Sequence, residues 1–243
     1  MSDIKALLLD LDDTLLLNDM ETFGQHYFEA LLAKVAPICP SEPFVKALRA
    51  GMQAMFDNDG TRGSNADVFA ASFFAQLPCE PQKLLALLDE FYRCDFEVLR
   101  VHTTPDPDAR RLVSTAFARG YQVAIATQPV FPLPAILARL RWAGAGADEF
   151  PYDYVSSYET MSACKPHPAF FQTLVERLGR EPDECLMVGD DPEADMAAGR
   201  LGLKTFWVKR GAWRPRHMYV SCDARGSLAE LIKLIETGRI YEL

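Results

Sequence analysis

The stretch that decides the fold is Ile4-Lys5-Ala6-Leu7-Leu8-Leu9-Asp10-Leu11-Asp12-Asp13-Thr14. Its first six positions form a short apolar run, which is typical of a strand buried on both faces of a parallel sheet. The run ends abruptly in three aspartates and a threonine. We therefore expect a buried first strand that delivers carboxylates at its carboxyl end.

Short apolar runs return later in the chain and alternate with segments of helical periodicity. The further strands are expected at 122–127, 154–157, 185–189 and 204–208. The helices are expected at 105–119, 133–143, 168–178, 193–201 and 227–237. Thr104 is the predicted N-cap of the first of these helices, with Pro105 at its first position. This alternation predicts a doubly wound, mostly parallel α/β sheet of the Rossmann-like kind.

The segment between the first two strands has a different pattern. From about residue 21 to 99 apolar residues recur at helical spacing, and about four helices are expected. The domain prediction is an α/β core of residues 1–17 and 104–243 with an inserted helical cap of residues 18–103. We interpret the aromatic residues of this insertion as the core of a helix bundle rather than a ligand cage: Phe23, Tyr27, Phe28, Phe56, Phe69, Phe73 and Phe74.

Charge and composition exclude some classes of partner. The 243 residues carry a formal net charge of −9. The chain therefore lacks the excess of basic residues that would predict binding to nucleic acid or to an anionic membrane surface. Residues 120–138 lack charged side chains, but their prolines argue against a membrane-spanning helix. The first residues do not resemble a secretory signal. We expect a cytoplasmic monomer or homodimer.

In an open parallel sheet, ligands bind outside the carboxyl ends of the strands. The predicted strands deliver Asp10 and Asp12, Thr127 and Asp190 to that edge, and Lys165 lies in the turn before a helix. Clustered carboxylates repel one another unless a cation lies among them. Magnesium prefers oxygen ligands and is usually held by one or two carboxylates together with a substrate phosphate. The pattern therefore predicts a Mg²⁺ site.

Two carboxylates beside a metal can take different roles in phosphoryl transfer. One attacks phosphorus while the other acts as general acid and then as general base. Asp10 and Asp12 are two residues apart, so they share a face of an extended chain. Thr127 can donate its hydroxyl to phosphate oxygens, and a phosphate would also offset the cation of Lys165 near a helix start.

The order of these motifs resembles the haloacid dehalogenase superfamily of phosphohydrolases, in the branch with a helical cap between the first and second motifs. The resemblance covers nearly the whole chain and is carried by Asp10-Leu11-Asp12-Asp13-Thr14, Thr127, Lys165-Pro166 and Gly189-Asp190-Asp191-Pro192-Glu193-Ala194-Asp195. It implies a nucleophile at Asp10 and an acid/base at Asp12, whose backbone carbonyl would also bind magnesium. It implies a metal carboxylate at Asp190 and phosphate contacts at Thr127 and Lys165.

The resemblance also suggests supporting residues. Asp191 or Asp195 would act in the outer metal shell or position Lys165. Two positions depart from the family pattern: Asp13 stands where many members have Gly, and Gln128-Pro129 stands where many have Asn-Gly. Pro129 has no N–H to lend to a phosphate. Gln128 and Arg62, in an inserted turn, are candidate substrate contacts.

These features predict a magnesium-dependent phosphatase that acts on a small phosphorylated metabolite through an aspartyl-phosphate intermediate. A haloacid dehalogenase shares the fold and the aspartate nucleophile, but it needs neither the acid at Asp12 nor a metal ligand at Asp190. A phosphomutase would transfer the phosphoryl group to a sugar instead of water, and the motifs do not separate the two. The third alternative is a non-catalytic interaction protein on the same scaffold.

Overall fold

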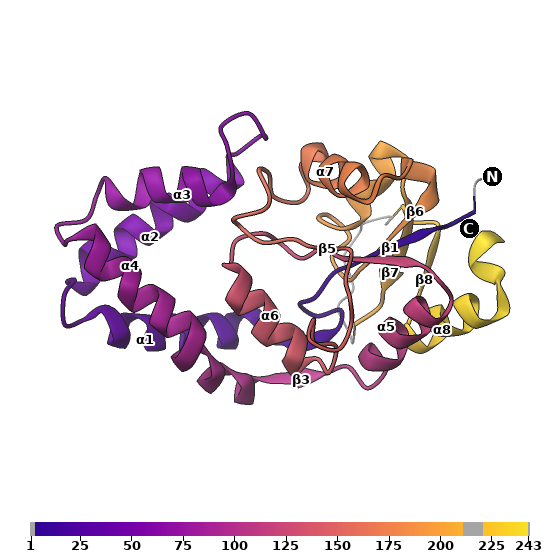
Figure 1. Cartoon of the computed structure of the whole chain (residues 1–243), viewed down its shortest axis with the longest axis horizontal. Helices are drawn as coiled ribbons and strands as arrows, with labels where there is room; N and C mark the ends of the chain where they lie inside the picture. The colour runs from indigo at the N-terminus through magenta and orange to yellow at the C-terminus, as the bar shows by residue number, and fades with distance from the viewer. Residues whose placement is uncertain (1–2, 211–220, 243) are drawn as a thin grey trace.

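The computed structural model describes residues 3–210 and 221–242, and its centre is a six-stranded parallel sheet (Figure 1). The strand order is β5-β4-β1-β6-β7-β8. The strands are β1 (Ala6–Leu9), β4 (Gln122–Ile125), β5 (Tyr154–Val155), β6 (Cys185–Gly189), β7 (Lys204–Val208) and β8 (Ala224–Gly226). β1 pairs with β4 on one side and with β6 on the other, so the first strand is central.

Helices cover both faces of the sheet. Alternate residues of β1 belong to different apolar clusters, because successive side chains of a strand point to opposite faces. Leu7 and Leu9 pack in a cluster with helices α5 (Ala109–Ala118), α6 (Leu133–Trp142) and α8 (Leu228–Thr237). Ala6 and Leu8 pack in a second cluster with α7 (Pro168–Leu178) and the 3₁₀ helix η4 (Met196–Leu201). The predicted doubly wound α/β fold is confirmed.

The inserted segment is helical and begins and ends at a small antiparallel pair. β2 (Leu16–Asn18) pairs with β3 (Thr103–Pro105). Between them lie α1 (Met20–Val35), α2 (Ser41–Phe56), α3 (Asn65–Phe74), α4 (Pro81–Glu90), the π-helical turn η1 (Phe91–Asp95) and the 3₁₀ helix η2 (Phe96–His102). These helices extend to one side of the sheet (Figure 1). The division into core and cap stays a prediction.

A second connection joins the insertion to the core far from the β2–β3 pair. The main-chain N–H of Asn65 donates to the carbonyl of Met161 at 2.7 Å, and that of Ala66 donates to Tyr158 at 2.8 Å. The buried side chain of Asn65 also donates to the carbonyl of Pro129 at 3.2 Å. The start of α3 is therefore hydrogen bonded to the loops that follow β4 and β5.

The prediction that a helix begins at Pro105 is wrong. Thr104 pairs with Leu17 in β3, and α5 begins only at Ala109. The N–H of Asp106 donates to the carbonyl of Leu15, and its carboxylate receives a bond from Arg210. These long-range partners hold the segment extended.

Two smaller features also differ from the sequence prediction. The segment expected as a helix from residue 193 contains a 3₁₀ helix that starts at Met196. β8 was not expected, because three residues without an apolar run give no strand pattern. In the part of the chain that is described, no helix is long and apolar enough to cross a membrane.

Candidate active site

The carboxylates of Asp10, Asp190 and Asp195 converge at the carboxyl edge of the central strands. Asp10 follows β1 and Asp190 follows β6, and these strands are direct neighbours in the sheet. One carboxylate oxygen from each of the three aspartates lies within 4.8 Å of the others. The backbone geometry predicted from the sequence thus brings the first and last motifs together.

Lys165 lies inside this cluster. Its ammonium group donates to Oδ1 of Asp10 at 2.7 Å and to Oδ1 of Asp195 at 2.6 Å, and all three side chains are buried. Its main chain is held as well, because the side-chain amide of Gln128 accepts from its N–H at 2.8 Å and donates to its carbonyl at 3.1 Å. Lys165 is therefore fixed at both ends.

Burial sets the electrostatics of the cluster. Desolvation of the carboxylate raises the pKa of Asp10 to about 7, against the lowering effect of Lys165. Desolvation and the charges of Asp10 and Asp195 raise the pKa of Asp190 to about 8. Burial opposes the charged form of Lys165, but the two carboxylates beside it outweigh that effect and raise its pKa. Lys165 therefore compensates the three carboxyl groups only in part, and their pKa values stay above that of a free aspartate.

Asp195 owes its place to the loop before it. Its Oδ2 accepts the N–H of Asp191 at 3.0 Å, while its Oδ1 accepts from Lys165. A Cβ on Gly189 would lie 2.1 Å from that Oδ2, so only glycine allows the close approach. Asp191 accepts the N–H groups of Glu193 and Ala194 with its own carboxylate, at 2.8 and 2.9 Å. Of the two predicted supporting aspartates, Asp195 is the one that contacts Lys165.

Thr127 follows β4 and its side chain is completely buried. Its carbonyl accepts from the hydroxyl of Ser156 at 2.9 Å, which anchors the main chain. Its own hydroxyl has no hydrogen-bond partner among the described residues. A buried polar group without a partner is costly. This hydroxyl is therefore available to a ligand oxygen.

The carboxylate of Asp12 has a different environment from that of Asp10. Nη1 of Arg139 contacts its Oδ1 at 2.8 Å and its Oδ2 at 2.6 Å, and Asn18 donates to Oδ1 at 3.2 Å. Asp12 is not part of the carboxylate cluster and faces the large cavity described below.

Arg139 was missed in the sequence, although a signal was present. Within α6 it occupies a helical face shared with Ala135 and Ile136, where a charged residue is unexpected. Its side chain is fully buried, and its guanidinium lies 4.4 Å from the ring centroid of Phe131. A buried arginine on an apolar face indicates an acidic partner.

Other predicted positions lie as follows. Asp13 has a φ of 52°, a left-handed conformation that glycine adopts most easily and aspartate tolerates, so the departure from Gly is accommodated. The amide of Gln128 is engaged by Lys165. Arg62 is exposed and donates to the carbonyl of Asp57. A substrate contact for Gln128 or Arg62 stays a prediction.

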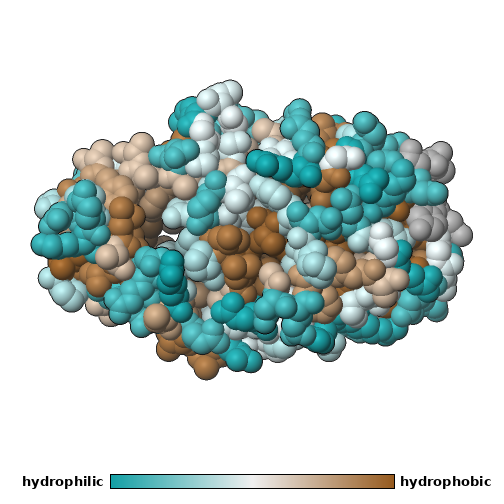
Figure 2. All heavy atoms as spheres, viewed as in Figure 1, coloured by the Kyte–Doolittle hydropathy of each residue, from teal (hydrophilic) through white to brown (hydrophobic). Residues whose placement is uncertain are grey.

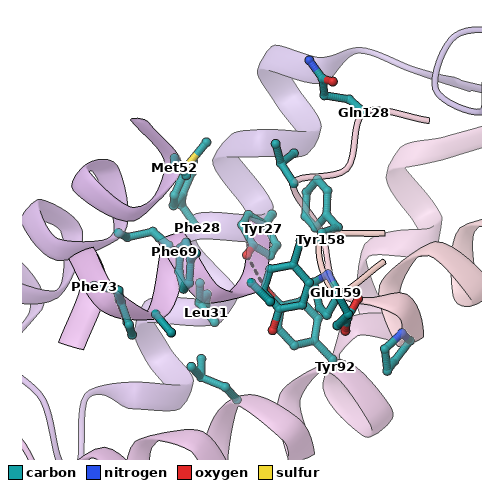
Figure 3. A pocket seen from close by; sticks show the side chains of 18 of the residues that line it. Tyr27, Phe28, Leu31, Met52, Phe69, Phe73, Tyr92, Gln128, Tyr158 and Glu159 are labelled. Atoms are coloured by element: carbon teal, nitrogen blue, oxygen red, sulfur yellow. Dashed lines mark hydrogen bonds between the residues drawn. The ribbon is translucent and has the colours of Figure 1, made fainter. Parts of the chain in front are cut away.

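A cavity of about 660 Å³ opens between the core and the inserted helices (Figure 3). Asp12, Gln128, Tyr158 and Glu159 line its core end. The seven aromatic residues singled out in the sequence all line it too, although most also pack in or against the main apolar cluster. Their interpretation as bundle core is therefore incomplete, because they also form the wall of a cavity.

The acidic cluster has the donor chemistry of a site for a hard divalent cation. Carboxylate oxygens are the preferred ligands of such ions. Both oxygens of Asp195 already accept protein hydrogen bonds, which leaves Asp10 and Asp190 as the carboxylates with the most capacity for a metal. The incomplete compensation of these carboxyl groups by Lys165 favours the same ligand.

Comparisons with known proteins agree with this architecture. The family model for haloacid dehalogenase-like hydrolases matches residues 4–202. The chain is 29% identical to the phosphoserine phosphatase of Thermus thermophilus, over 94% of this chain and 98% of that protein. It is 27% identical to the glyceraldehyde 3-phosphate phosphatase of Pyrococcus furiosus, over 97% and 93% of the two chains.

Solved structures show the same fold at lower sequence identity. A haloacid dehalogenase-type phosphatase from Thermococcus onnurineus superposes with a TM-score of 0.57 at 23% identity, covering 96% of this chain and 98% of that one. The L-2-haloacid dehalogenase RSc1362 also gives 0.57, at 17% identity and with coverage of 97% and 100%. Likeness of fold therefore does not separate the two chemistries, whereas the full-length sequence relatives above are both phosphatases. The chain belongs to the haloacid dehalogenase-like hydrolase family, on its phosphatase branch.

Proposed function

We propose that the chain is a magnesium-dependent phosphatase that hydrolyses a small phosphate monoester through an aspartyl-phosphate on Asp10. The observation that carries the proposal is the convergence of Asp10, Lys165 and Asp190 at the edge of the sheet to which the neighbouring β4 delivers Thr127, whose hydroxyl has no partner among the described residues. This combination offers a nucleophile, a cation and a hydrogen-bond donor within one buried site. A non-catalytic scaffold would have no need of so many buried charges.

The phosphate would be bound by groups already oriented for it. The hydroxyl of Thr127 donates to one phosphate oxygen, and the ammonium of Lys165 neutralises charge on another. Because Gln128 and Asp195 hold Lys165 from opposite ends, its ammonium needs little reorganisation when the substrate arrives.

The carboxylates of Asp10 and Asp190, with the backbone carbonyl of Asp12, would hold Mg²⁺. When bound, this ion supplies positive charge that offsets the carboxylates and the phosphate. Asp195 acts on Lys165 rather than on the metal, because both of its oxygens are engaged.

The chemistry then needs two carboxylates with separate duties. A carboxylate oxygen of Asp10 bonds to phosphorus as the ester P–O bond breaks, and Asp12, which must enter this step protonated, gives its proton to the departing alkoxide. Asp12, now ionised, takes a proton from water whose oxygen attacks the same phosphorus. The bond from phosphorus to Asp10 breaks, and inorganic phosphate leaves. Pairing with Arg139 holds the carboxylate of Asp12 toward the side from which the leaving group departs.

The test is release of inorganic phosphate from simple phosphate monoesters in the presence of Mg²⁺. Asp10→Asn should lower the rate more than a thousandfold, because the nucleophile is lost. Asp183→Asn, in an exposed turn before β6 and thus at the opposite edge of the sheet, is the matched control and should keep full activity. Persistence of activity in Asp10→Asn would overturn the nucleophile assignment.

Two further readouts separate the alternatives. A fluoride mimic of the phosphoryl group should bind tightly to the wild type and not to Asp10→Asn. Release of halide from a haloacid without metal would support a dehalogenase. Conversion of one sugar phosphate isomer into another, with no free phosphate, would support a phosphomutase.

A further inference from the structure

The cavity beside Asp12 is far larger than a phosphate group requires. Its volume of about 660 Å³ falls in the range of sites that enclose whole small molecules. It begins at Asp12 and Gln128, at the same edge of the sheet as the catalytic residues, and reaches Phe56 and Leu85 in α2 and α4. A leaving group that extends from a phosphate at Asp10 past Asp12 would enter this space.

The wall of the cavity is mainly aromatic and aliphatic (Figure 3). Phe28, Met52 and Phe69 lie close together on the part of the wall formed by the inserted helices, and the hydroxyls of Tyr27 and Tyr92 bond to each other at 2.7 Å, which satisfies both polar groups. Figure 2 shows hydrophobic residues beside a hollow at the end of the molecule formed by the inserted helices. A ligand therefore meets apolar surface over most of its length.

The charges on this wall have one sign. The ionisable acidic residues that line the cavity are Asp12, Asp89 and Glu159, and no lysine, arginine or histidine is among its described lining residues. The carboxylate of Glu159 is partly engaged, because it accepts from the N–H of Leu133 and the hydroxyl of Ser157. An anionic group on the ligand would find no partner here.

The nearest cationic side chains are already paired with carboxylates of the protein. Arg139 is bonded to Asp12 and covered by Phe131, which itself lines the cavity. Lys165 is bonded to Asp10 and Asp195. The side chain of Arg139 is fully buried and does not line the cavity, so its remaining N–H groups are shielded from a ligand. Lys165 could meet a second acidic group of the substrate only by leaving a buried carboxylate, which is strongly unfavourable.

We propose that this cavity binds an uncharged, apolar alcohol portion of the substrate. The chain would then hydrolyse phosphate esters of aliphatic or aromatic alcohols in preference to phosphorylated acids. This inference rests on the proposed phosphatase function. A phosphorylated acid such as phosphoglycolate would bring its carboxylate to an apolar and acidic wall.

The experiment compares kcat/KM for ethyl phosphate, hexyl phosphate and phosphoglycolate with Mg²⁺ present. Each fully buried methylene should raise kcat/KM about fourfold. Hexyl phosphate should exceed ethyl phosphate by more than about tenfold even if only half of its additional chain is buried. Ethyl phosphate should in turn exceed phosphoglycolate, which carries a carboxylate and no ammonium group. A flat series, or a preference for phosphoglycolate, would overturn the proposal.

A matched pair of variants ties the preference to the cavity. Met52→Gln places an amide in the wall and should lower the ratio of hexyl to ethyl phosphate by about fivefold or more. Val98→Gln makes the same kind of change on η2, at an exposed valine outside the cavity lining, and should leave the ratio unchanged. An equal ratio in both variants would contradict the assignment of the cavity.

A binding measurement tests the preference of the cavity independently of hydrolysis. Hexylphosphonate, which cannot be hydrolysed, should bind more tightly than ethylphosphonate by the same factor in calorimetry. If the chain hydrolyses none of the esters but still binds hexylphosphonate more tightly than ethylphosphonate, the phosphatase proposal is contradicted and the cavity proposal is supported. Hydrolysis that depends on Asp10 but not on chain length would support the phosphatase and contradict the cavity.

Discussion

Arg139 and Asp12, 127 positions apart in sequence, form an ion pair in which one guanidinium nitrogen contacts both carboxylate oxygens, at 2.8 and 2.6 Å. The arginine side chain is fully buried, whereas that of Asp12 keeps 20% of its surface exposed. Nε and Nη2 of Arg139 have no hydrogen-bond partner among the described residues. Burying a guanidinium with so little compensation is costly. The pair thus points to a positioning role of Arg139 on the carboxylate that faces the cavity.

Replacing Arg139 should affect the general acid more than the nucleophile. In Arg139→Met, kcat/KM for an alkyl phosphate should fall at least about tenfold further than kcat/KM for p-nitrophenyl phosphate, because only the alkoxide needs a proton to leave. Stability in chemical denaturation should be unchanged or higher, because Met removes a buried guanidinium with two unpartnered groups and the carboxylate of Asp12 keeps 20% of its surface exposed. Arg141→Met, exposed on the same helix, is the control. Equal losses for both esters would indicate a structural role alone.

Gly189 should not tolerate a side chain. The Cβ of Gly189→Ala would lie 2.1 Å from Oδ2 and 2.7 Å from Cβ of Asp195, so Asp195 must move away from Lys165. We expect loss of most activity and a destabilisation of about 1–3 kcal/mol. In the control Gly199→Ala the nearest atom, Cγ2 of Thr205, is 3.7 Å away, which is an ordinary contact. Normal activity in Gly189→Ala would contradict the positioning of Lys165 by Asp195.

Magnesium should stabilise the folded chain independently of any substrate. At a concentration one hundred times its dissociation constant, a ligand of the native state adds about 2.7 kcal/mol of stability. The melting temperature should therefore rise with added Mg²⁺ in the wild type and not in Asp190→Asn. Without metal, Asp190→Asn should melt at the same or a higher temperature, because one of three mutually repelling carboxylates is gone. A wild type indifferent to Mg²⁺ would remove Asp10 and Asp190 as metal ligands.

Arg62, in the exposed turn between α2 and α3, remains a candidate residue for binding an anionic group of the substrate. A contact between Arg62 and a substrate anion predicts that Arg62→Ala raises KM with little change in kcat, which is the signature of lost ground-state binding, whereas the apolar cavity predicts an unchanged KM for hexyl phosphate. Arg49→Ala, on α2 of the same insertion, provides a comparison. Unchanged KM in Arg62→Ala would exclude the contact and agree with its absence from the residues that line the cavity.

The sequence predicted five strands of the central sheet, and with them the placement of Asp10 and Asp190 at one edge, because both depend on local patterns. An apolar run followed by Asp10 is read directly from the chain, and α7 begins and ends where Pro168 and Leu178 predicted. β8 was missed because its three residues have no local strand pattern, whereas three other failures involve distant partners. The segment at Thr103–Pro105 is a strand and not the start of a helix because it pairs with Leu17. The helix α5 begins later than predicted because Asp106 is bonded to Leu15 and Arg210. The orientation of Asp12 depends on Arg139.

The seven aromatic residues of the insertion illustrate the same limit at the level of function. Helical periodicity tells that Phe69 and Phe73 face inward, but not whether the helices close completely around them. Whether an inward face becomes packed core or the wall of a cavity depends on the spacing between helices. That spacing is set by contacts such as those of Asn65 with the core loops.

The two main-chain hydrogen bonds from the start of α3 to Met161 and Tyr158 have an evolutionary consequence. Together with the β2–β3 pair they connect the insertion to the core at two places, one where the chain enters and leaves it and one at its middle. Main-chain groups common to every residue except proline form these hydrogen bonds, so they do not depend on the side chains that line the cavity. A lineage that carries this enzyme can therefore exchange wall residues one at a time and acquire new substrates while the carboxylate cluster is left untouched.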